Sequence, residues 1–174
     1  MSTKYIFLID NRSQLNYYPA MQLTLYTDYS LRVLLYLGEH PNERITITQM
    51  SEYFDISRNH LVKVVHNLGK LELIHTIRGK NGGMWLAQEP KNINIATVVR
   101  KVEPHMNLLE CFDDKTNTCP ITKNCGLKHI LFKAKKSFMD VLKEHTLADL
   151  LPENNNTVIQ HIPLKSIQLA STNK

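Results

Sequence analysis

The fold follows from residues 57–86, which read SRNHLVKVVHNLGKLELIHTIRGKNGGMWL. Ser57 is suited to cap a helix that runs from Arg58 to about Lys70, because its hydroxyl can accept a hydrogen bond from a free N–H group of the first turn. Four apolar residues recur in this helix at the spacing of one buried face: Leu61, Val64, Val65 and Leu68. The segment therefore predicts a helix that is packed on one side and polar on the other.

A basic hairpin follows this helix. Residues 74–77 (IHTI) predict a strand, residues 78–83 (RGKNGG) a turn, and residues 84–86 (MWL) a returning strand. Just upstream, Thr46 and Gln49 have the spacing of a capping box for another short helix. Two short helices joined by a tight turn and followed by a glycine-rich hairpin are typical of a winged helix-turn-helix domain, which binds DNA.

Positive charge is concentrated in the same segment. Residues 57–83 hold five lysines and arginines against one acid, whereas the whole chain has a net charge of +5. A solubilising surface charge is the ordinary explanation for any single one of them, and we prefer it for Lys70. The predicted DNA contacts are Ser57 and Lys63 on phosphates, Arg58, Asn59 and His60 on base edges, and Arg78, Lys80 and Gly82 in the wing.

Three cysteines lie close together as Cys111, Cys119 and Cys125, with seven and then five residues between them. Thiolates at this spacing, in a polar segment, suit a metal or an iron–sulfur cluster better than disulfides, which would leave one thiol unpaired. The plainer alternative is three unrelated buried cysteines. A zinc site or a thiol redox switch in the same loop is a further alternative.

Three more helices are predicted from apolar spacing. Residues 27–37 predict a largely buried helix with Thr27 as its N-cap, and residues 93–103 predict an amphipathic helix. Residues 126–145 predict a long helix with an apolar stripe and lysines on its other side. We expect this stripe to pack against the same helix of a second subunit. Folding back onto its own domain is the alternative.

The predicted fold class is thus mainly α with a small β wing, a winged helix-turn-helix domain plus a long dimerisation helix. In the predicted organisation, residues 1–20 form an extension without an assigned function and residues 21–104 the DNA-binding domain. The cysteine loop (105–126), the dimerisation helix with a short C-terminal helix capped by Thr146 and Asp149 (127–151), and a flexible tail (152–174) follow.

Composition excludes several classes of protein. At 174 residues with 43% hydrophobic content, the chain suits one domain with appendages. No apolar run reaches the roughly 18 residues of a membrane span, and the N-terminus lacks a signal-peptide core, so we expect a cytoplasmic protein without a membrane partner. A small thiol enzyme or cluster carrier is an alternative, but no CxxC motif or glycine-rich phosphate loop supports it. We therefore predict no enzymatic activity.

From Met21 to about Leu151 the chain resembles a known family, the iron–sulfur winged-helix transcriptional repressors. The resemblance rests on MQLTLYTDYSLRVLLYL (21–37), SRNHLVKVVHNLG (57–69), HTIRGKNGG (75–83), the three cysteines and TLADLL (146–151). It implies a homodimer that binds double-stranded operator DNA and holds an iron–sulfur cluster, 2Fe–2S or 4Fe–4S, in each cysteine loop. SRNHLVKV with RGKNGG is closer to the members that sense nitric oxide than to those that respond to cluster supply, which remain the alternative.

The resemblance also implies further cluster ligands. In the nitric-oxide-sensing members an acid near the start of the first helix of the partner subunit can be a fourth ligand, and this position here is Asp28. Arg32 lies one turn later and is expected to pair with Asp28 or to stabilise the cluster region. The cluster-supply members use a histidine where this chain has Lys128, so His129, one position later, is the second choice. In this hypothesis nitric oxide displaces the carboxylate first, and the dimer releases its operator.

Overall fold

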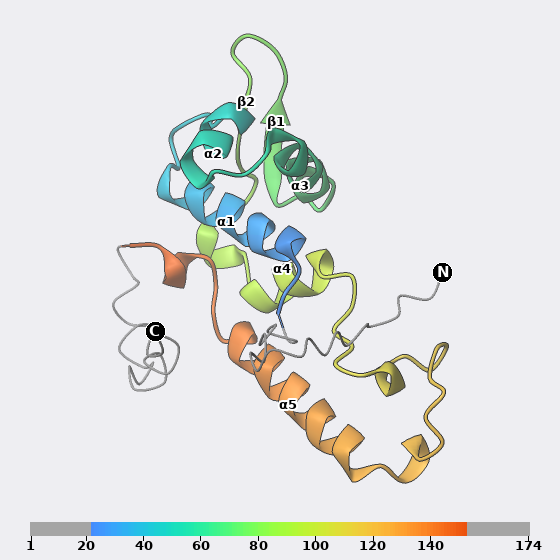
Figure 1. Ribbon diagram of the computed structural model, residues 1–174. Helices are drawn as coiled ribbons and strands as arrows, with labels where there is room; N and C mark the ends of the chain where they lie inside the picture. Colours follow the sequence, from blue (N-terminus) through green and yellow to red (C-terminus); the bar gives the residue numbers. More distant parts are fainter. Residues whose placement is uncertain (1–21, 153–174) are drawn as a thin grey trace, which may run out of the picture.

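The computed structural model describes residues 22–152, so the predictions for residues 1–20 and for nearly all of the tail lie outside the described residues. In chain order the helices are α1 (Leu25–Glu39), α2 (Ile47–Phe54), α3 (Arg58–Lys70), α4 (Ile95–Val102) and α5 (Gly126–Lys143), and the strands are β1 (Ile74–Ile77) and β2 (Gly83–Leu86). Short 3-10 turns lie at Pro90–Asn92, Glu110–Phe112, Thr122–Asn124 and Ala148–Leu150. The predicted fold class, mainly α with a small β wing, is confirmed (Figure 1).

The helix-turn-helix forms through the predicted local caps. The Thr46 hydroxyl accepts a hydrogen bond from the N–H of Gln49, and the Gln49 side chain accepts one from the N–H of Thr46, which completes the capping box of α2. The Ser57 hydroxyl accepts a hydrogen bond from the N–H of His60 and caps α3. Between the two helices, Asp55 takes a left-handed conformation with φ of 52°, which a short polar side chain tolerates.

The wing forms as predicted, and an isolated bridge joins it to the segment before α2. Strands β1 and β2 are antiparallel, with Ile74 opposite Leu86. Ile45, in the loop before α2, forms a bridge with Met84, in which each residue's N–H donates to the other's carbonyl at 3.1 and 2.8 Å. The wing is therefore attached by backbone hydrogen bonds to the segment that leads into the helix-turn-helix.

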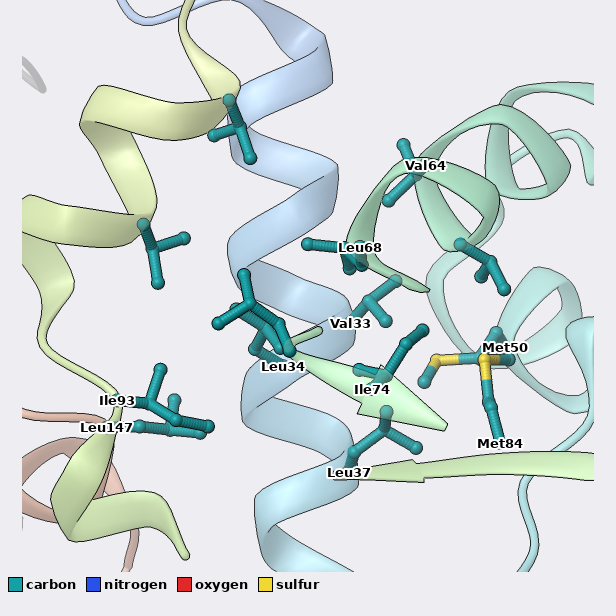
Figure 2. Close-up of a cluster of buried hydrophobic side chains, with 14 of the residues drawn as sticks. Val33, Leu34, Leu37, Met50, Val64, Leu68, Ile74, Met84, Ile93 and Leu147 are labelled. Atoms are coloured by element: carbon teal, nitrogen blue, oxygen red, sulfur yellow. The ribbon is translucent and has the colours of Figure 1, made fainter. Parts of the chain in front are cut away.

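The hydrophobic core is centred on α1, which lies between the helix-turn-helix and α4 (Figure 1). Val33, Leu34 and Leu37 of α1 are at most 1% exposed, and Leu68 of α3 and Ile74 of β1 lie beside them (Figure 2). Burying one such side chain stabilises a fold by about 1.5–3 kcal/mol. Both α3 and the wing therefore pack against α1, which fixes their positions relative to each other.

The start of α1 differs from the prediction. Thr24 is the N-cap, and its hydroxyl accepts a hydrogen bond from the N–H of Thr27 at 3.3 Å. Thr27 is fully buried and donates its own hydroxyl to the carboxylate of Glu103, just after α4. Glu103 also accepts the N–H and the hydroxyl of Thr24, at 3.2 and 3.0 Å. The prediction of Thr27 as the cap was wrong, because the Thr27 hydroxyl is bonded to the distant carboxylate of Glu103 and the Thr24 hydroxyl caps the helix instead.

Helix α5 extends away from the other helices (Figure 1). None of its residues is buried by the described part of the chain. Several large apolar side chains of this helix are at least 40% exposed, namely Leu127, Ile130, Phe132, Phe138 and Val141. The predicted helix is confirmed, and most of its apolar surface is left uncovered within residues 22–152.

The chain returns to the domain directly after α5. The N–H of Ile95 donates to the carbonyl of His145 at 3.0 Å, and the N–H of Leu147 donates to the carbonyl of Ile93 at 2.8 Å. Leu147 is fully buried beside Ile93 (Figure 2). Residues 145–151, which we call the return strap, therefore attach the end of α5 to α4.

The cap predicted for the short C-terminal turn is present in the return strap. The Asp149 carboxylate accepts the N–H of Thr146 at 2.7 Å and its hydroxyl at 3.0 Å. The hydrogen bond from the Thr146 backbone is the main cause that lowers the pKa of Asp149, because it favours the charged carboxylate.

Candidate functional site

The N-terminal end of α3 presents the predicted base-reading residues to solvent. Arg58, Asn59 and His60 occupy the first turn and are exposed, and Lys63 is exposed one turn later. The hydroxyl of Tyr26 donates to the carbonyl of Lys63 at 3.3 Å and ties this helix to α1. Burial raises the pKa of Tyr26, because partly dry surroundings disfavour the charged phenolate.

The wing tip presents two cations on a turn that requires glycine. Arg78 and Lys80 are exposed. Gly79 has φ of 107°, which favours glycine, and its carbonyl accepts the N–H of Gly82 at 2.9 Å. A Cβ on Gly82 would lie 2.3 Å from the carbonyl oxygen of Ile77. Gly82 therefore has a structural role in shaping the turn that carries the two cations.

A groove of about 960 Å³ runs between α3 and the wing. Its lining includes four cationic side chains, Arg58, Lys63, Lys70 and Arg78, and two histidines, His66 and His75, and none of the described lining residues is acidic. A groove lined in this way attracts a polyanion. Lys70, for which the sequence favours a solubilising role, lies in this groove, and so does His75 of β1.

The three cysteines lie on the irregular segment between α4 and α5. Cys111 is buried in the turn Glu110–Phe112, whereas Cys119 and Cys125 are partly exposed. All three thiols are free. Phe112 is held against α5, where Lys135 lies 4.9 Å from its ring centroid.

A pocket of about 610 Å³ opens beside Cys119, with Asp114, Lys123, Lys128 and His129 in its lining. It brings the second-choice ligand His129 near one cysteine. Among residues 22–152 no three side chains of histidine, cysteine, aspartate or glutamate are grouped as the ligands of a metal ion. The donor chemistry nevertheless suits an iron–sulfur cluster, because three free thiols lie in one polar loop.

Asp28 and Arg32 form the predicted pair on α1. Their charged groups are 2.7 Å apart, and both side chains are partly exposed. The Arg32 guanidinium also lies 6.0 Å from the ring centroid of Tyr29, and the Tyr29 ring lies 6.2 Å from that of His60 on α3. The first turns of α1 are thus in contact with the end of α3 that carries the predicted base-reading residues.

A capped recognition helix, a basic hairpin beside it and a cationic groove between them define a winged-helix DNA-binding protein. A family model described as Rrf2, iron-dependent transcriptional regulator, matches residues 23–153. The chain belongs to the Rrf2 family of transcriptional regulators.

Characterised relatives sharpen this assignment. The chain is 47% identical over 146 residues to the HTH-type transcriptional regulator NsrR of Bacillus subtilis (strain 168), an alignment that covers 83% of this chain and 99% of that one. It is 49% identical over 132 residues to NsrR of Shouchella clausii (strain KSM-K16), covering 75% and 89%. The family resemblance predicted from the sequence is confirmed, and the branch predicted from SRNHLVKV and RGKNGG is that of the NsrR proteins. These relatives are named as transcriptional regulators, which are generally not enzymes.

Solved structures show the same fold. T. potens IscR superposes with a TM-score of 0.60 at 23% identity, covering 88% of this chain and 93% of that one. A putative transcriptional regulator from Listeria innocua gives a TM-score of 0.67 at 20% identity, covering 91% and 98%. No helix in the described range is long and apolar enough to cross a bilayer.

Proposed function

We propose that this protein is a transcriptional repressor that binds a palindromic operator as a homodimer and releases it in response to nitric oxide. The observation that carries the proposal is a loop of three free thiols placed between a winged-helix unit and a helix with an uncovered apolar face, in a chain closely related to NsrR proteins. We assign the cluster to Cys111, Cys119 and Cys125. A thiolate-bound iron–sulfur cluster supplies iron that reacts with nitric oxide.

The DNA contacts follow from the geometry of the winged helix. Arg58, Asn59 and His60 lie at the exposed start of α3, the part of a recognition helix that reaches base edges. Ser57 and Lys63 are assigned to phosphates, and Arg78 and Lys80 to the adjacent minor groove or to the phosphates of its walls. Lys70 and His75 are added because they line the same groove.

The second subunit is assigned to the apolar face of α5. Leu127 is 57% exposed and Ile130 is 67% exposed, values that an isolated chain rarely shows on one long helix. Packing two copies of this face together removes it from water and relates the two DNA-binding units by a two-fold axis. A palindromic operator has the same symmetry.

The fourth ligand is assigned to Asp28 of the partner subunit. In the single chain Asp28 is paired with Arg32, so Arg32 would hold this carboxylate whenever it is not bound to the partner's cluster. A carboxylate is a harder donor than a thiolate, so Asp28 would be the weakest of the four ligands. The Arg32–Tyr29–His60 contacts then connect Asp28 to the base-reading end of α3.

Anaerobic purification followed by visible absorption and native mass spectrometry tests the cluster assignment. The wild-type dimer is expected to be coloured and to bleach when nitric oxide is added, and Asp28→Ala to lose or weaken cluster binding. Glu89→Ala is the matched control, because Glu89 is also an exposed acid in an ion pair. Unchanged cluster binding in Asp28→Ala would move the assignment to His129. A colourless protein would reject the cluster: bound zinc would favour a zinc site in the loop, and a metal-free protein would favour a thiol redox switch.

A salt titration tests the DNA assignment. The probe is a duplex selected by the wild-type protein from a random library. Arg78→Ala is expected to weaken binding to it and to lower the slope of log K against log salt by about one, the value for one lost phosphate contact. An unchanged slope would remove Arg78 from the interface.

A further inference from the structure

Arg44, in the loop between α1 and α2, contacts the wing at its turn and at strand β2. Its neighbour Ile45 forms the bridge with Met84 on β2. A Cβ on Gly83 would lie 2.9 Å from the Cβ of Arg44 and 3.0 Å from its carbonyl carbon. The Arg44 backbone and the base of the wing are therefore in direct contact, and residue 83 must be small.

The side chain of Arg44 reaches further along the wing. Its guanidinium donates to the carbonyl of Asn81 at 3.3 Å and lies 5.4 Å from the ring centroid of Trp85. Trp85 in turn lies 5.5 Å from the ring of His75 on the paired strand. One side chain thus contacts both the turn and the returning strand of the hairpin.

We propose that Arg44 is a positioning residue for DNA binding, which fixes the wing turn so that Arg78 and Lys80 face the same duplex as α3. This inference rests on the DNA-binding role proposed above. Arg44 is two residues before Thr46, the N-cap of α2, so the same segment supports the wing and starts the helix-turn-helix.

The physical need for such a support lies in the hairpin itself. A two-stranded hairpin is marginally stable in water, and this one has two glycines in its turn, Gly79 and Gly82, and a third at the start of β2. An unsupported tip would have to be ordered when DNA binds, and that ordering would reduce the affinity. Arg44 supplies a charged donor to the Asn81 carbonyl and a cation over the Trp85 ring, so the turn is ordered beforehand.

The test compares single variants of the full chain on the duplex selected by the wild-type protein. Arg44→Ala is expected to weaken binding about fivefold to tenfold while keeping the wild-type salt slope, because a supporting residue makes no phosphate contact. Arg78→Ala is the comparison that lowers the slope. Arg100→Ala, which removes an exposed cation of α4, is the matched control and should bind as the wild type does.

Tryptophan fluorescence gives a second reading without DNA. Trp85 is the single tryptophan of the sequence, so its emission should change in Arg44→Ala and not in Arg100→Ala. If Arg44→Ala does not fold, Arg44→Gln replaces it, since it keeps a donor for the Asn81 carbonyl but loses the cation.

Three results separate the possibilities. Unchanged affinity and unchanged Trp85 emission would overturn the supporting role of Arg44. A salt slope lowered by about one in Arg44→Ala would overturn it as well, because Arg44 would then be a phosphate contact. Failure of the wild-type protein to select any duplex would instead refute the proposed DNA-binding function.

Discussion

Glu103 is expected to be one of the most sensitive polar residues of the domain, and Glu103→Ala to lower the free energy of unfolding by about 2–3 kcal/mol. Its carboxylate accepts three hydrogen bonds from the start of α1, two from Thr24 and one from Thr27. Thr27 is fully buried, so its hydroxyl would lose the carboxylate away from water and keep only the Thr24 hydroxyl, 3.1 Å away, as a partner; an imperfectly satisfied buried group of this kind costs about 1–3 kcal/mol. Thr24 is half-buried, so water replaces part of what it loses.

Urea denaturation of the full chain measures this effect, and a double-mutant cycle isolates its source. Thr27→Val removes the buried hydroxyl at similar volume, so Glu103→Ala should cost about 1 kcal/mol less in that background. Glu144→Ala, which removes an exposed acid, is the control and should stay within about 0.5 kcal/mol of the wild type. An equal cost of Glu103→Ala with and without the Thr27 hydroxyl would refute the reasoning.

Leu147→Ala should lower the free energy of unfolding by about 2–5 kcal/mol, because it opens a cavity where the return strap meets α4, and a loss below about 1 kcal/mol would contradict that packing. The pKa of Asp149 in the folded protein is lower than its ordinary value of 3.8. The stability that this carboxylate contributes is therefore present above pH 3.8 and is lost as the pH falls through the pKa of the folded state. Asp149→Asn should therefore lose less stability than the wild type on acidification below about pH 4, and parallel pH profiles would count against this. Ser57→Ala should cost about 1 kcal/mol in the same denaturation assay, and no loss would mean that its hydroxyl does not stabilise α3.

The helix-turn-helix and the wing were predictable because their signals are local. The Ser57 cap acts within one turn of helix, and the capping box joins Thr46 and Gln49, three residues apart. The turn at Gly79 has a positive φ that favours glycine, and the glycine is visible in the sequence. Such features depend on backbone geometry over a few residues, so a single sequence contains them.

The features that the sequence did not reveal depend on distant residues. Thr24 and Thr27 are equally good caps by residue type, and the choice between them depends on Glu103, 76 residues after Thr27. In the same way, Arg44 contacts Asn81, 37 residues along the chain, and no local pattern marks that contact. Long-range hydrogen bonds of this kind are set by packing of the whole domain, which periodicity does not report.

These long-range contacts also determine how the cysteine segment is connected to the DNA-binding unit. At its start, Glu103 is bonded to the first turn of α1, the turn that also carries Asp28. At its far side, α5 ends in the return strap, where Leu147 is buried beside Ile93, just before α4. Between these two attachments lie the three cysteines and the uncovered face of α5. Under the proposed function, a rearrangement of the cysteine loop would act on a segment whose two ends are fixed to the DNA-binding domain, and α1 would be the element that connects it to α3.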